Sequence, residues 1–150
     1  MRKLTVLCAL VVIFGVTIGG RQLHAQDNDK LIRFRTPSSN IHCMFVMGEN
    51  KTEPNGIACD IANRSNKKPI LPKPKDCEFD WGQRFELGNS GDAGLECASD
   101  WVGSDDSRVL QYGSSLRLGN IICSSLQSGL ECKNDKGRGF FLSRSFQKIF

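Results

Sequence analysis

The sequence predicts a small all-β domain cross-linked by disulfide bonds, in which antiparallel hairpins form a sandwich or a pseudo-repeated barrel. Three observations lead to this fold class. Short apolar segments alternate with polar residues at the period of a strand, and polar turns that contain glycine separate these segments. Six cysteines also follow a segment with the features of an export signal.

That segment, residues 1–25, reads as a signal peptide. Arg2 and Lys3 precede an apolar run from Leu4 to Gly19, and Ala25 closes a stretch that suits signal peptidase. The run of about 16 residues is shorter than the roughly 20 that span a bilayer, with a retained membrane anchor as the alternative. We therefore expect one domain over residues 26–150, a secreted or periplasmic location, and no membrane span after cleavage.

Removal of the leader changes the charge balance. Three of the 20 basic residues and none of the 16 acidic residues lie in the leader, which leaves 17 against 16. This near-neutral balance gives no electrostatic signal for nucleic acid. Cys8 also leaves with the leader, and the even number of six remaining cysteines predicts disulfides formed in an oxidising compartment.

The first hairpin is predicted within residues 31–61. Residues 31–36 alternate like a half-buried strand, and residues 41–47 and 56–61 then form two arms with apolar side chains on one face. A bridge between Cys43 and Cys59 sets a register in which these apolar side chains face each other. The opposed pairs are Ile41 with Ile61 and Phe45 with Ile57.

The second predicted hairpin joins Cys77 to Cys97. Its register places Phe79 opposite Leu95, and a weak strand at residues 84–87 lies in the long intervening loop. The third hairpin is the clearest, because two short apolar arms flank a two-residue loop, a favoured hairpin length. Its cysteines are Cys123 and Cys132, and its loop is Gln127-Ser128.

The remaining predicted elements are short. They are an extended, proline-rich crossing at residues 67–75, strands at 109–110, 116–118 and 139–142, and either a strand or a single helical turn at 143–150.

Six cysteines permit 15 pairings, and we favour the three that each close a predicted hairpin. These are Cys43–Cys59, Cys77–Cys97 and Cys123–Cys132. Short motifs recur around the cysteines, such as Asn-Ile-x-Cys and Gly-apolar-x-Cys. They indicate either a pseudo-repeat, such as a three-fold barrel, or recurring turn chemistry.

An ordered set of motifs carries a family resemblance. The set comprises Phe34-Arg-Thr-Pro-Ser-Ser-Asn-Ile-His-Cys43, a proline-rich approach to Cys77 with Asp80-Trp-Gly82, Tyr112-Gly113, Asn120-Ile-Ile-Cys123 and Gly137-Arg-Gly-Phe-Phe-Leu-Ser-Arg144. It resembles a group of small exported bacterial cysteine-containing domains whose function is unassigned. The resemblance implies export, disulfides and a single domain, and it supplies no activity. Members often carry histidine where this chain has Arg138.

His42 is the only histidine after the leader, and it lies on the strand face opposite the core cysteines. A catalytic histidine would need a carboxylate and an arginine, for which Arg138 and Arg144 are candidates. An ordinary surface histidine is the simpler interpretation. A lone histidine does not build a zinc site and the cysteines are used in bridges, so we expect no metal or cofactor.

Trp81 and Trp101 each follow an aspartate that lies three residues after a cysteine. If exposed, they would stack on sugar rings or contact a protein partner. The alternative is that each covers a disulfide at the edge of the core.

No catalytic motif is assembled in the sequence. We therefore expect a non-enzymatic module that binds a protein or a glycan at the cell envelope, and not nucleic acid. The alternative is a small secreted hydrolase or nuclease that uses His42 with an acidic residue and an arginine. A third hypothesis is that the protein inhibits another enzyme. Convergence of His42, Arg138 and Arg144 in one cleft would favour the enzyme.

Overall fold

The structure is a computed structural model that describes residues 32–48 and 54–150, so the predicted signal peptide lies outside the described residues. One set of strands comprises β1 (Arg33–Arg35), β2 (Ile41–Met47), β3 (Pro54–Ile61), β4 (Asp80–Gly88), β5 (Ala93–Ala98) and β6 (Arg108–Val109). The other comprises β7 (Ser115–Leu118), β8 (Ile121–Leu126), β9 (Gly129–Asn134), β10 (Gly139–Leu142) and β11 (Gln147–Ile149). The described residues contain no helix, which confirms the all-β class.

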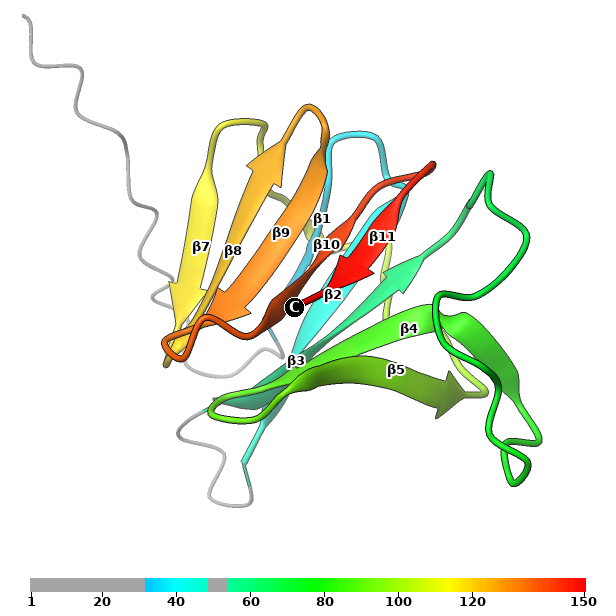
Figure 1. Cartoon of the computed structure of the whole chain (residues 1–150). Helices are drawn as coiled ribbons and strands as arrows, with labels where there is room; N and C mark the ends of the chain where they lie inside the picture. The colour runs from blue at the N-terminus through cyan, green and yellow to red at the C-terminus, as the bar shows by residue number, and fades with distance from the viewer. Residues whose placement is uncertain (1–31, 49–53) are drawn as a thin grey trace, which may run out of the picture.

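These strands form two sheets (Figure 1). The larger has the order β5-β4-β3-β2-β1-β6, and the smaller has the order β11-β10-β9-β8-β7. Each sheet therefore keeps two edge strands. A barrel requires a sheet closed on itself, so the barrel alternative, including the three-fold one, is wrong for the described residues.

One core joins the two sheets in a sandwich. Four phenylalanines that are at most 1% exposed lie in it: Phe34, Phe45, Phe85 and Phe140. Phe85 of β4 and Phe140 of β10 link the sheets, with ring centroids 5.9 Å apart. Apolar side chains at every second position of the strands fill the space between the sheets, as the alternation in the sequence predicts.

Two of the three hairpins have the predicted register. Cys43 faces Cys59 across β2 and β3, and Cys123 faces Cys132 across β8 and β9. Each pair forms a disulfide with a Cα–Cα distance of 4.1 Å. The opposed apolar pairs of the first hairpin are Ile41 with Ile61 and Phe45 with Ile57, as predicted.

The second hairpin differs from the prediction. Cys77 and Cys97 form the expected disulfide, but Cys77 lies in the loop before β4 and not in a strand. Leu95 faces Phe85, while Phe79 is 55% exposed, so the predicted Phe79–Leu95 register is wrong. The bridge fixes a loop onto an edge strand, and the strand register follows the apolar side chains further along β4 instead.

The strands predicted on either side of Tyr112 belong to different sheets. β6 pairs with β1 in parallel, whereas β7 pairs with β8. The chain must therefore cross the larger sheet from β5 at one edge to β6 at the other. We call the crossing segment, residues 99–107, the strap. It lies on the outer face of the sheet, where the Val102 amide donates to the Asp60 carboxylate at 2.7 Å.

Candidate functional site

Turns from both sheets meet at one end of the sandwich and enclose an open groove of about 400 Å³. In Figure 1 the β1–β2, β8–β9 and β10–β11 turns lie together at the upper end of the molecule. We call this cavity the loop-end groove. It is lined by Thr36, Ser38, Ser39, Asn40, Ile41, Asn63, Tyr112, Leu126, Gln127, Ser128, Gly129, Ser143, Arg144 and Ser145.

Nine residues that line the loop-end groove, besides Tyr112, carry hydroxyl or amide side chains. Its one aromatic side chain is Tyr112, which is 43% exposed, and its one charged side chain is Arg144. None of these lining residues is acidic. Such a surface offers many hydrogen-bond donors and acceptors beside one apolar ring. That combination suits a polar ligand that has both hydroxyl groups and a flat apolar face.

Hydrogen bonds within the chain hold the walls of the groove in place. The Asn40 and Asn63 segments are tied twice, by Asn40 Nδ2 to the Asn63 carbonyl at 3.2 Å and by the Asn63 amide to Asn40 Oδ1 at 3.0 Å. The Ser65 amide donates to the Arg144 carbonyl at 2.8 Å. The β10–β11 turn is thereby fixed against the chain that follows β3, so contacts within the chain hold the groove in shape.

Ser39 has an unusual backbone conformation in the wall of the groove. Its φ is 54°, in the left-handed region that residues other than glycine seldom adopt. Its hydroxyl accepts a hydrogen bond from Arg35 Nη1 at 2.7 Å, and its carbonyl accepts one from His42 Nε2 at 3.1 Å. Neighbouring side chains therefore stabilise a costly conformation, a feature that is common at functional sites.

His42 is next to the groove but does not line it. Its Nε2 donates to the Ser39 carbonyl, while Nδ1 is buried and without a hydrogen-bond partner among the described residues. The ring packs on Trp101 of the strap, with centroids 5.3 Å apart. Gly103 passes so close that a Cβ there would lie 2.8 Å from Nδ1 and would collide with Trp101. His42 therefore has a packing role beneath the strap.

The other predicted site residues are spread over the molecule. Arg144 lines the groove, but Arg138 lies before β10, whereas Arg144 follows it, and Arg138 pairs with Asp92 at 3.2 Å. Trp81 donates from Nε1 to the Leu71 carbonyl at 3.0 Å. His42, Arg138 and Arg144 thus share no cleft among the described residues.

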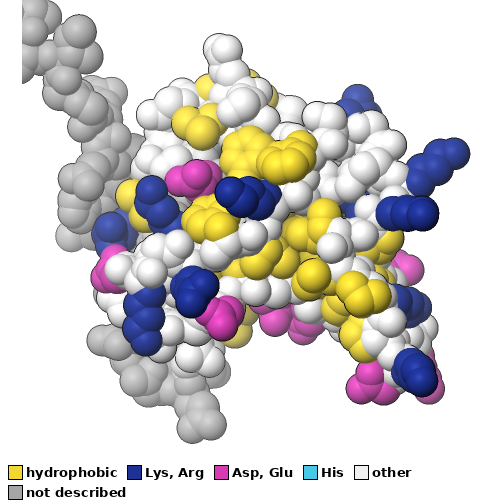
Figure 2. Space-filling model, viewed as in Figure 1, with side chains coloured by type: hydrophobic (Ala, Val, Ile, Leu, Met, Phe, Trp, Pro, Cys, Tyr) yellow, Lys and Arg dark blue, Asp and Glu magenta, His cyan; other side chains and the backbone are white. Residues whose placement is uncertain are grey.

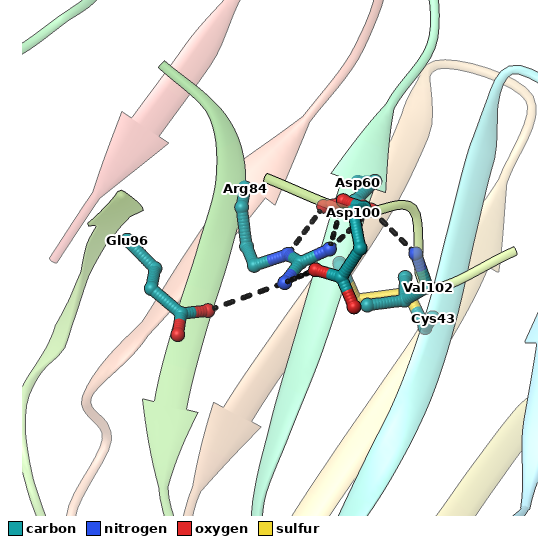
Figure 3. A network of polar contacts seen from close by, with 7 residues as sticks. Cys43, Asp60, Arg84, Glu96, Asp100 and Val102 are labelled. Atoms are coloured by element: carbon teal, nitrogen blue, oxygen red, sulfur yellow. Dashed lines mark hydrogen bonds and ion pairs between the residues drawn. A yellow bond between two sulfur atoms is a disulfide. The ribbon is translucent and has the colours of Figure 1, made fainter. Parts of the chain in front are cut away.

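A buried ionic network on the outer face of the larger sheet is absent from the sequence prediction. Arg84 binds Asp60 with two parallel hydrogen bonds, from Nε at 2.8 Å and from Nη2 at 2.9 Å (Figure 3). Arg84 also donates to the Asp100 carboxylate at 3.1 Å and to the Asp100 carbonyl at 2.7 Å. The hydrogen bond with Asp60 raises the pKa of the Arg84 guanidinium. The network anchors the strap to β3 and β4.

Two carboxyl groups beside this network influence each other. Burial, which is the largest cause, together with the hydrogen bond and the negative charge of Glu96, raises the pKa of the Glu86 carboxyl to about 7. Glu96 also lies 3.7 Å from Arg84. Alternation along β4 places Arg84 and Glu86 on the polar face, which the sequence pattern treats as exposed to solvent. Only the path of the strap, which no short motif encodes, indicates the burial of Arg84.

A second exposed surface lies on the outer face of the smaller sheet. Phe141 and Phe146 pack with ring centroids 6.2 Å apart, and Lys148 lies 5.7 Å from the centre of the Phe150 ring. Figure 2 shows hydrophobic side chains gathered on this side of the molecule among basic and acidic ones. This patch shares none of its residues with the loop-end groove.

Within residues 32–48 and 54–150, no group of three His, Cys, Asp or Glu side chains is placed to hold a metal ion. The same residues include no helix of the length and hydropathy needed to cross a bilayer. The model of a protein family described as "Family of unknown function (DUF6636)" matches residues 10–150. Comparisons with curated proteins and with solved structures found no match.

Proposed function

The chain belongs to the family of unknown function DUF6636, and we propose that it is a non-catalytic module that binds a carbohydrate in the loop-end groove. The observation that carries the proposal is the lining of the groove. Besides the exposed ring of Tyr112, the lining includes six residues with hydroxyl side chains and three with amide side chains: Thr36, Ser38, Ser39, Ser128, Ser143 and Ser145, with Asn40, Asn63 and Gln127.

This lining matches the surface of a sugar. A sugar ring presents hydroxyl groups around its edge, which serine and amide side chains bind as donors and acceptors. It also presents a face of C–H groups, which packs on an aromatic ring. Because the walls are already tied together, ordering them on binding costs little free energy.

The location of the protein fits this role. Three disulfides are typical of proteins that fold in an oxidising compartment. The sequence predicts cleavage after Ala25, so we place the module outside the cytoplasm, where envelope or extracellular glycans are its ligands. The hydrolase alternative has less support, because the Nε2–H of His42 is bonded to the Ser39 carbonyl and His42 is separated from Arg138.

The proposal is tested with an array of immobilised oligosaccharides and the oxidised protein. Binding is expected for the unmodified chain, and Tyr112→Ala should weaken it about tenfold, the loss expected for one aromatic contact of about 1.4 kcal/mol. Phe79→Ala is the matched control, because Phe79 also has an exposed aromatic ring but lies outside the groove.

Two results would oppose the proposal. One is the absence of binding to every saccharide by a folded protein. The other is equal weakening by Tyr112→Ala and Phe79→Ala, because this would place the ligand away from the groove. Retained binding by Tyr112→Phe would show that the ring face and not the phenol hydroxyl makes the contact.

A further inference from the structure

The charge on the lining of the loop-end groove is positive only. Arg144 is the one charged side chain among the lining residues, and no carboxylate lines the groove to oppose it. Arg35 adds a second positive charge at the wall, where its Nη1 donates to Ser39 Oγ. The two charged side chains at the groove are therefore both positive, although the chain after the predicted leader is near neutral.

The guanidinium of Arg144 is free to bind a ligand. Three other arginines, Arg84, Arg117 and Arg138, each have a carboxylate within 3.2 Å. Arg144 is exposed, and within the described residues its side chain has no ion pair or hydrogen bond. Its backbone carbonyl, in contrast, accepts from both the amide and the hydroxyl of Ser65, at 2.8 and 3.2 Å. The main chain of Arg144 is thus fixed, while the N–H donors of its planar guanidinium remain available to a ligand.

Ser39 supplies a second donor in the same groove. Its oxygen already accepts from Arg35, so its own O–H is left to donate elsewhere. A hydroxyl that accepts from a cation is a better donor, because the hydrogen bonds polarise each other. An anionic oxygen accepts such charge-assisted bonds more strongly than a neutral hydroxyl does.

We propose that the loop-end groove selects an acidic saccharide, whose carboxylate or sulfate group binds Arg144 while the sugar ring packs on Tyr112. This inference rests on the proposed carbohydrate-binding function and adds the ligand class. A guanidinium binds either anion with two parallel hydrogen bonds, so both sources of charge share one recognition chemistry.

Calorimetry with matched oligosaccharides tests the inference. The probes are oligogalacturonate against its neutral galactose counterpart of equal length, and sulfated against unsulfated dextran oligosaccharide. We expect the acidic member of at least one pair to bind at least tenfold more tightly. This preference should decrease between 50 and 300 mM salt (roughly 14 to 6 Å in screening length), because salt screens exposed charges.

Substitutions test whether Arg144 causes the preference for the acidic sugar. Arg144→Gln should abolish it, so that the ratio of the affinities for the acidic and the neutral sugar falls to about one, whereas Arg144→Lys should keep part of the preference, since the charge remains without the planar fork. Arg138→Gln is the control, because it removes an equal charge at the opposite end of β10.

The outcomes separate the two proposals. Equal affinity for acidic and neutral sugars, or a preference that survives Arg144→Gln, overturns the acidic ligand class while carbohydrate binding stands. No binding to any saccharide overturns the proposed function itself. A preference in the galacturonate pair alone assigns a carboxylate, one in the dextran pair alone assigns a sulfate, and both support the inference.

Discussion

At the scale of single residues, the Arg84–Asp60 pair is the clearest example of a feature that alternation along a strand does not reveal. Their side chains are 8% and 3% exposed, yet each occupies the face of its strand that the pattern assigns to solvent. A sequence pattern reports which face is apolar, but it does not report which segment later crosses the polar face. The strap buries this pair, and its path depends on the whole topology.

Asp60→Asn should destabilise the protein by about 3–5 kcal/mol, because it leaves the buried charge of Arg84 without its main partner. Urea denaturation at neutral pH measures the change in the free energy of unfolding. Arg117→Gln is the control, since it breaks the exposed Arg117–Asp135 pair and should cost less than about 1 kcal/mol. Similar losses for the two variants would contradict the assigned burial of the Asp60 pair.

Glu86 should make stability depend on pH. Its pKa in the folded protein is about 7, above the usual 4.5, so between these values the folded state holds a proton that the unfolded state has released. Stability from this group is fully present below about pH 4.5 and is lost as the pH rises through 7. Glu86→Gln should remove this part of the pH dependence.

The measurement for Glu86 is the free energy of unfolding of the unmodified chain and of Glu86→Gln, between about pH 4.5 and 8. The difference between Glu86→Gln and the unmodified chain should grow in favour of the variant as the pH rises. Glu78→Gln, at an exposed position before β4, provides the control. A constant difference across the range would refute the shift.

At the scale of elements, the hairpins show what sequence can and cannot specify. Where two facing cysteines also align apolar neighbours, as Cys43 and Cys59 do, the period of two leaves one consistent register. Cys77 has no such support, because Phe79 near it is exposed and β4 begins only at Asp80. A disulfide limits a distance between two residues, and it does not require either of them to be in a strand.

The disulfides should differ in their resistance to reductant. Cys97 is partly exposed and Cys77 is 8% exposed, whereas the four cysteines of the other two bridges are fully buried. A thiolate reductant needs access to the sulfur, so Cys77–Cys97 should open first in the native protein. Alkylation and mass spectrometry at rising dithiothreitol concentration provide the measurement. Initial alkylation at Cys43 or Cys123 would contradict this order.

At the scale of the whole molecule, the cysteine and strand patterns predict the all-β class and the disulfide pairs. They do not predict the choice of a sandwich over a barrel, the parallel β1–β6 pair or the strap, because these depend on contacts between distant parts of the chain. The loop-end groove is missed for the same reason. Arg144 is named from the sequence, but its neighbours Asn40, Asn63 and Tyr112 meet it only in three dimensions.

Complete reduction should unfold the protein. The chain-entropy estimate gives roughly 3 kcal/mol for each bridge, and three bridges together approach the net stability of a whole domain, about 5–15 kcal/mol. Circular dichroism melting curves with and without a strong reductant test this expectation. Superimposable curves, with free thiols confirmed by mass, would mean that the phenylalanine-rich core is sufficient.

β1 is made early during synthesis, yet one of its two partners comes much later, since Phe34 pairs with Arg108. Until the ribosome has released the segment as far as β6, the backbone groups of β1 on the side away from β2 have no strand to bind. A chain halted before this point would present an open strand edge, a template for aggregation. Enclosure of the first strand is therefore a late event in biogenesis, and dependence on a chaperone until then is its expected consequence.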